Sequence, residues 1–201
     1  MNKRFASAAL TAVMALSLAV PAFADTISKE NQETKIPVKI SAEATIFNVT
    51  LPTDFPITVD PTTGETTGAN NADITNNSAG SIKVSKIEVE NYDVWNLAAY
   101  DTDMSKEKVD SNKIGVMVSP KGGANATAGG TELKTTNGNT TKQTLLDADS
   151  ATASEWVMNG KSAADGSNKL TVNYDAKVSP VSQSITNTQV ASIVVTVAWN
   201  A

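Results

Sequence analysis

The stretch Ser81–Tyr100 constrains the fold more than any other part of the chain, because apolar and polar residues alternate along its first half. Ile82 and Val84 alternate with polar neighbours, two polar residues adjoin, and Ile87 and Val89 then resume the alternation. Successive side chains of a strand point to opposite faces, so this pattern predicts a half-buried β-strand. The adjoining polar pair shifts the phase by one residue and predicts a β-bulge between Val84 and Ile87.

A second apolar segment follows this strand closely. Asn91–Asp93 has the composition of a turn, and the apolar pattern then resumes over Val94–Tyr100. Trp95 is the largest side chain of the region and can bury about 200 Å². The sequence therefore predicts a β-hairpin that places Trp95 and Leu97 in the core.

Other segments alternate in the same way or are short apolar runs between turn residues. These candidate strands are Ile36–Ile40, Ile46–Leu51, Ile57–Val59, Asp73–Asn76, Ile114–Val118, Glu132–Asn139, Lys169–Val178 and Ile193–Trp199. Short strands separated by turns, with almost no helical periodicity, predict an all-β protein. We expect an antiparallel, immunoglobulin-like β-sandwich of about eight to ten strands.

Two of these strands carry positional signals. Pro37 has no N–H to donate, so it predicts that Ile36–Ile40 begins at this residue or lies at a sheet edge. Ile193–Trp199 is apolar on one face and small and fairly apolar on the other. This second pattern predicts a central strand with Trp199 in the core.

The N-terminus has the features of a secretory signal peptide. A short basic region precedes an apolar run, and Ala22-Phe23-Ala24 provides the small residues that signal peptidase requires. We expect cleavage after residue 24, a polar N-terminal arm over residues 25–34 and a single β-sandwich domain over residues 35–201. No later segment is long and apolar enough for a bilayer span, so we expect an extracellular protein without membrane insertion.

Three residue types are missing from the mature chain, and their absence restricts the chemistry. Residues 25–201 contain no His, no Cys and no Arg. Catalytic triads and zinc sites built on His or Cys are therefore excluded within one chain. A carboxylate pair could still hydrolyse a glycoside, although acidic residues are abundant enough to approach one another by chance. We predict a protein that is not an enzyme and has no cofactor.

The charge of the mature chain excludes another class of function. After cleavage, 14 lysines and 21 acidic residues remain, so the net charge is about −7. Nucleic-acid binding requires a basic surface. We therefore expect no nucleic-acid partner.

One segment carries oxygen-bearing side chains at alternate positions, as a calcium loop does. These residues are Asp101, Asp103, Ser105 and Glu107. The EF-hand pattern also requires Gly at the sixth position and Glu at the twelfth, and both are missing. We interpret the segment as a polar turn and keep calcium binding as the alternative.

The three tryptophans divide into two groups. Trp95 and Trp199 continue apolar strand faces, which predicts that both lie in the core. Trp156 lies in the sequence SEWVMNG, between polar flanks. We expect Trp156 at the rim, where it is the candidate for stacking against a sugar ring.

The tryptophan pattern also carries a resemblance. Trp95-Asn96-Leu97 matches Trp-x-Leu after an alternating strand and a turn, and Ile193–Trp199 is a second apolar strand that ends in Trp. This arrangement resembles the WxL-type surface domains of Gram-positive bacteria, and more broadly the small β-sandwich surface proteins of gut Firmicutes. The resemblance implies a secreted, β-rich protein held non-covalently at the cell wall.

We therefore expect a secreted, non-catalytic binding module at the surface or cell wall of a Gram-positive bacterium. Its partners would be peptidoglycan, a host glycan or a host protein such as immunoglobulin. The alternative is a structural subunit of a surface fibre. The polar arm leads into the predicted strand Ile36–Ile40. Because such a strand can complete the sheet of a neighbouring copy, self-association is the basis of this alternative.

Overall fold

The computed structural model describes residues 46–59, 66–68, 72–126 and 129–200. The chain divides into two compact units, Met1–Ala42 and Glu43–Ala201, and the described residues all belong to the second. The predicted signal peptide, the polar arm and the strand Ile36–Ile40 lie outside the described residues. Within the described ranges, no helix has the length and apolar character needed to cross a membrane.

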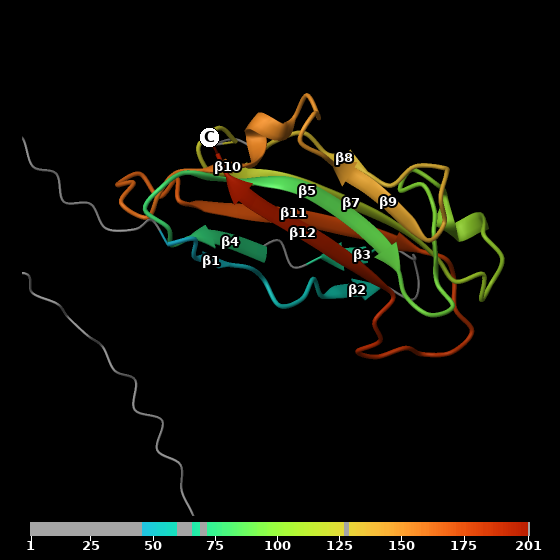
Figure 1. The fold of residues 1–201 in the computed structure, drawn as a ribbon. Helices are drawn as coiled ribbons and strands as arrows, with labels where there is room; N and C mark the ends of the chain where they lie inside the picture. The colour runs from blue at the N-terminus through green and yellow to red at the C-terminus, as the bar shows by residue number, and fades with distance from the viewer. Residues whose placement is uncertain (1–45, 60–65, 69–71, 127–128, 201) are drawn as a thin grey trace, which may run out of the picture. The chain divides into compact units, whose positions relative to one another are not determined.

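The described part is mostly β-structure, which confirms the predicted all-β class (Figure 1). Sheet I contains, in spatial order, β1 (Val49–Thr50), β4 (Ala72–Asn76), β11 (Lys169–Val178), β7 (Lys113–Gly122) and β6 (Asn96–Leu97), with β8 (Leu133–Lys134) also on β7. Sheet II contains β10 (Val157–Met158), β5 (Ile82–Asn91) and β12 (Ala191–Trp199), with β9 (Lys142–Leu146) also on β5. β2 (Ile57–Val59) pairs with β3 (Thr66–Gly68), and the described helices are two 3₁₀ turns, η1 (Met104–Lys106) and η2 (Ala153–Trp156).

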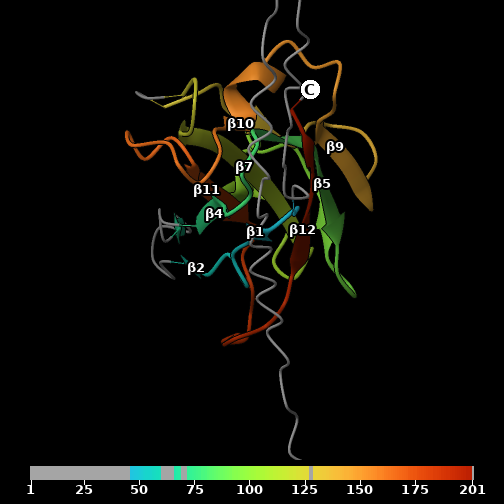
Figure 2. The same ribbon diagram turned by 60° about the vertical axis from the view of Figure 1, so that its left-hand side comes forward.

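The two larger sheets share one apolar core. Figure 2 shows β5, β9 and β12 on one side and β4, β7 and β11 on the other. The buried cluster is built from both sheets and includes Ile74, Ile82, Val84, Ile87, Val89, Val118, Leu170, Val172 and Tyr174. Burial of this apolar surface is the main stabilising contribution in a chain that has no cysteine.

Strand β5 confirms the prediction made from its alternation. Ile82, Val84, Ile87 and Val89 are all buried. Thr196 of β12 pairs with Lys86 of β5, and Val197 pairs with Val84. The register therefore shifts by one residue, and Ser85 is the extra residue on β5. This residue lies between the two alternating halves of β5, so the predicted bulge is confirmed.

The predicted hairpin after β5 is wrong. The chain turns at Tyr92–Trp95 and crosses to sheet I, where β6 pairs with β7 in parallel. The physical reason is that both edges of β5 are already occupied, by β12 on one side and by β9 and β10 on the other. The core prediction still holds, because Trp95 and Leu97 are buried on the far side of the crossover.

The prediction that the last strand is central is also wrong. Among the described residues, β12 pairs only with β5 and therefore lies at the edge of sheet II. Trp199 is 39% exposed rather than in the core, and its ring packs edge-to-face on Phe47 with 5.1 Å between centroids. Apolar residues on both faces of a strand indicate nearby apolar surface, but they do not reveal how many neighbours the strand has.

The expected exposure of Trp156 is wrong as well, because its side chain is 0% exposed. Trp156 ends η2, and the following β10 pairs with Ile82 and Lys83 at the start of β5. The short 3₁₀ turn keeps Ser154 at the surface while it directs the indole into the core. The polar flanks are therefore the solvent side of one turn and not evidence of a rim.

Several other segments match their predictions, while some boundaries differ. Ile57–Val59, Asp73–Asn76, Ile114–Val118 and Lys169–Val178 are strands, as expected. The segment Ile46–Leu51 contributes only the two residues of β1. Thr66–Gly68, which is not among the candidate strands, pairs with β2.

Candidate binding cleft

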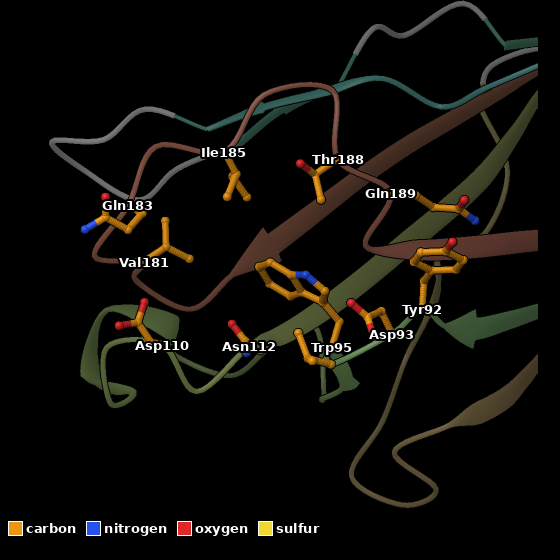
Figure 3. Close-up of a pocket in the computed structure, with 11 residues that line it drawn as sticks. Tyr92, Asp93, Trp95, Asp110, Asn112, Val181, Gln183, Ile185, Thr188 and Gln189 are labelled. Carbon is orange, nitrogen blue, oxygen red and sulfur yellow. The ribbon is translucent and has the colours of Figure 1, made fainter.

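An open cleft of about 420 Å³ lies where three loops meet (Figure 3). The loops are the crossover from β5 to β6, the segment that precedes β7 and the connection from β11 to β12. The residues that line it are Tyr92, Asp93, Val94, Trp95, Asp110, Asn112, Val181, Gln183, Ile185, Thr188 and Gln189. Loops held by a rigid β framework are the usual location of binding residues.

Backbone hydrogen bonds join the three loops to one another. The N–H of Tyr92 donates to the carbonyl of Val190 at 3.2 Å, and the N–H of Asp110 donates to the carbonyl of Pro180 at 2.8 Å. The crossover is held in turn by the N–H of Asn96, which donates to the carbonyl of Asn112 at 2.7 Å. Because each loop bonds to another, the cleft is largely pre-formed, as ligand sites usually are.

Three of the residues that line the cleft have left-handed backbone conformations. Their φ angles are 51° at Asp93, 62° at Asp110 and 51° at Asn112, and Asn187 is the one further non-glycine case among the described residues. Asp and Asn tolerate this region better than other side chains. The left-handed conformation of these Asp and Asn residues is typical of tight turns, and all three lie in the loops that form the cleft.

The cleft has apolar and aromatic walls. Tyr92 is 48% exposed and Val94 is 58% exposed, while Trp95 is buried apart from the part that reaches the cleft. Figure 3 shows the Trp95 indole in the middle of the labelled side chains, with Ile185 and Thr188 on one side and Asn112 on the other. The exposed apolar side chains give a ligand a surface to pack against.

The lining residues carry two carboxylates, Asp93 and Asp110, and no lysine. The backbone N–H of Ser182 donates to Oδ1 of Asp110 at 2.8 Å, and this bond lowers the pKa of the Asp110 carboxyl below its ordinary value. Asp110 is therefore ionised at neutral pH. A cleft with negative charge and without a cation disfavours anionic ligands and favours neutral or positively charged ones.

Amide side chains supply the remaining polar groups of the cleft. Asn112, Gln183 and Gln189 each offer a carbonyl oxygen and an NH₂ group. Nε2 of Gln189 also donates to Oγ of Ser192 at 2.9 Å, which orients that side chain. Amides and carboxylates beside an apolar wall are suited to a ligand with hydroxyl groups and an apolar face.

The residues singled out from the sequence are distributed unevenly with respect to this cleft. Trp95 lines it, and Leu97 lies in the core just beyond it. Trp156 is the sequence-based candidate for stacking against a sugar ring, but it is fully buried and cannot do so. Trp199 is not among the cleft residues.

The structure does not bring the calcium candidates together as a ligand set. Asp101 pairs with Lys134 at 3.3 Å, Asp103 with Lys106 at 2.7 Å and Glu107 with Lys113 at 2.7 Å. Oγ of Ser105 donates to Asp103 at 2.6 Å. Within the described ranges, no group of three acidic side chains is placed to hold a metal ion. Each of the three carboxylates therefore has a lysine as its partner.

The sequence predicts few of the residues that line the cleft. The segment Val181–Thr188 is polar and turn-like, and the apolar residues within it, Val181 and Ile185, are the signal that could have indicated a binding loop. Asp110 and Asn112 carry no comparable signal, because their role depends on how η1 and β7 place them.

Comparison with known proteins gave no relative: no family model, no curated protein and no solved structure matches this chain.

Proposed function

We propose that this protein is a secreted, non-catalytic binding module of a Gram-positive bacterial surface and that its loop cleft binds a neutral glycan. The observation that carries the proposal is the pre-formed cleft, which combines an aromatic and apolar wall with carboxylate and amide groups. For the whole domain we propose the immunoglobulin-like antiparallel sandwich, with the cleft at the loops of one end.

The lining residues match the chemistry of a sugar ring. The apolar C–H face of a sugar packs against an aromatic side chain, and Tyr92 is exposed in the cleft wall. Hydroxyl groups donate to carboxylates such as Asp93 and exchange hydrogen bonds with amides such as Asn112. The negative charge favours neutral glycans over sialylated or phosphorylated ones.

A glycan of the bacterial cell wall and a neutral glycan of a host both fit this chemistry, and the wall glycan is the first candidate. The signal peptide pattern and the Trp95-Asn96-Leu97 resemblance support a place at the bacterial cell wall, so the glycan strand of peptidoglycan comes first. A neutral host glycan is the alternative, and a host protein such as immunoglobulin would have to offer basic or aromatic side chains to the same cleft.

Binding to purified cell walls tests this proposal. The mature protein is expected to sediment with walls and to be released by soluble neutral wall fragments, but not by sialylated or phosphorylated glycans. Tyr92→Ala is expected to abolish sedimentation, because it removes the exposed aromatic wall of the cleft. Phe47→Ala is the matched control, since Phe47 is 41% exposed and lies outside the cleft. The proposal fails if the wild-type protein stays in the supernatant at every salt concentration and binds no neutral glycan.

A further inference from the structure

The outer edge of β12 is open among the residues that the structure describes. This nine-residue strand lies beside β5 (Figure 1), and the backbone groups that it turns away from β5 have no hydrogen bond to a described residue. Natural edge strands are usually protected by Lys, Pro or short length. β12 has none of these features, since its sequence is ASIVVTVAW.

The core is also incompletely covered along this edge. Ile193, Val195 and Val197 pack against the core but are only partly buried. Their partners on β5, such as Val84 and Val89, are 0% exposed. A further strand beside β12 would cover these side chains and would bond to the backbone groups that have no partner among the described residues.

The chain contains a segment with the pattern that such a strand needs. Ile36, Val38 and Ile40 alternate with polar residues and Pro, and 21 residues of the mature chain precede Ile46, where the described part begins. A strand with this alternation presents its apolar side chains on one face, which can cover the partly buried side chains of β12.

The position of Phe47 argues that this segment comes from another copy. Phe47 packs on Trp199, at the end of β12. If the preceding residues of the same chain ran along β12 from that point, residues 41–45 would lie opposite residues 193–197. Residues 41–45 read SAEAT and have no large apolar side chain, whereas Ile36–Ile40 would then lie opposite residues 188–192, at the start of β12 and beyond it.

We propose that Ile36–Ile40 of a second copy of this chain adds as a strand to the outer edge of β12, which no described strand covers. Main-chain hydrogen bonds supply the pairing, and Ile36, Val38 and Ile40 cover the partly exposed side chains of the edge. Each copy offers one donor segment and one acceptor edge at different places. The contact is therefore heterologous and extends into a linear assembly unless a ring closes.

Introduced cysteines test this proposal directly, because the chain has none. The full mature chain is prepared as Lys39→Cys in one sample and as Thr196→Cys in another; Lys39 is a polar position of the alternating segment, and Thr196 is an exposed polar position of β12. Mixing the two under oxidising conditions is expected to give disulfide-linked dimers of one chain of each kind. Lys121→Cys, on an exposed residue of β7, replaces Thr196→Cys as the control and is expected to give no enrichment above random collision.

The double variant distinguishes the two sources of the donor strand. If Lys39→Cys/Thr196→Cys forms only an internal disulfide in a monomer, the segment pairs within its own chain and the proposal is wrong. The proposal is equally wrong if the mixed samples cross-link no faster than the control.

A proline variant provides the second readout. Val38→Pro removes an N–H from the donor strand and is expected to abolish concentration-dependent assembly in light scattering, whereas Gln32→Pro in the polar arm is expected to assemble like the wild type. Neither change touches the cleft, so glycan binding is expected to be unchanged in both. Assembly that persists in Val38→Pro would contradict the proposal without affecting the proposed function.

Discussion

The side chain of Asn91 is bonded to the backbone of Trp95: Nδ2 of Asn91 donates to the carbonyl of Trp95 at 2.6 Å. This bond closes the crossover between the sheets, together with the N–H of Trp95, which donates to the carbonyl of Tyr92 at 3.1 Å. The turn directs Trp95 into the base of the cleft and leaves Tyr92 exposed in its wall. The geometry of the cleft therefore depends on a side chain that is not part of its lining.

Asn91→Ala is expected to lower the free energy of unfolding by about 1–2 kcal/mol, because it removes this bond and leaves a partly buried carbonyl without its donor. Ligand affinity is expected to fall as well, since the crossover loses its restraint. Asn96→Ala is the control, because its side-chain bond to Val94 is long, at 3.4 Å, and exposed. Urea denaturation of the two variants checks the difference, and equal midpoints would contradict the role assigned to Asn91.

Trp156 and Trp199 are expected to differ in their contributions to stability. Trp156→Ala is expected to cost about 3–5 kcal/mol, because it leaves a large cavity in the core. Trp156→Phe is expected to cost much less, since Nε1 of Trp156 is buried and has no hydrogen-bond partner among the described residues. Trp199→Ala is expected to cost less than Trp156→Ala, because Trp199 is partly exposed at the sheet edge.

Fluorescence of single-tryptophan variants provides an independent check of these positions. Trp156 is expected to emit at the shortest wavelength and to resist acrylamide, whereas Trp199 is expected to emit at a longer wavelength and to be quenched readily. A quenchable Trp156 in a folded protein would show that η2 does not direct the indole into the core.

Gly115 permits the segment after β6 to lie against β7. A Cβ at this position would come within 2.7 Å of the backbone Cα of Tyr100, and backbone cannot move aside as a flexible side chain can. Gly115→Ala is therefore expected to destabilise the protein by about 1–3 kcal/mol. Gly138→Ala is the matched control, because a Cβ there meets no atom within 4 Å. Thermal unfolding of both variants tests this contact, and an unchanged melting temperature for Gly115→Ala would refute it.

Glu88 makes the stability of sheet II depend on pH. Its carboxylate pairs with Lys86 at 2.8 Å and with Lys142 of β9 at 3.2 Å, and the hydrogen bond from Lys86 is the largest cause that lowers the pKa of Glu88 below its ordinary value of 4.5. The folded state therefore favours the charged form. The resulting stability is present above pH 4.5 and is lost as the pH falls through the lowered pKa.

Glu88→Gln is expected to lower the denaturation midpoint at pH 7 and to have little effect at a pH below the lowered pKa of Glu88. Glu132→Gln is the control, because the Glu132 side chain is 56% exposed. Urea midpoints measured from pH 7 down to acid check this dependence. A Glu88→Gln effect that is the same at every pH would mean that the charge of Glu88 is not the cause.

Much of the β-structure is predicted from local patterns, because alternate residues of a strand point to opposite faces and the buried face is therefore apolar. The alternation in β5, its bulge, and the strands β7 and β11 follow from the sequence in this way. The neighbours of a strand cannot be predicted in this way. The crossover after Asn91 occurs because β5 already has neighbours on both edges, and the residues near Asn91 carry no signal of this pairing. The edge position of β12 and the burial of Trp156 depend on the same non-local pairing.

The candidate cleft was less predictable than the fold. The size of Trp95 and its strand pattern predict a core residue and not a cleft residue, and the residues opposite it in the cleft come from segments about 15 and 90 positions further along the chain. Their approach depends on the loop-to-loop bonds of Asp110 with Pro180 and of Tyr92 with Val190. For Trp156 the sequence signal is misleading. Its polar neighbours predict exposure, but they carry no information about which side of the turn faces the core.

The most direct test of the central claim uses Trp95 as the reporter. The variant Trp156→Phe/Trp199→Phe leaves Trp95 as the single tryptophan, in contact with the cleft. Titration with soluble neutral wall glycan is expected to give a saturable change in Trp95 emission. The change is expected to disappear when Tyr92→Ala is added and to remain when Phe47→Ala is added. No change with any neutral glycan, or the same change in the presence of Tyr92→Ala, would contradict the assignment of this cleft as the binding site.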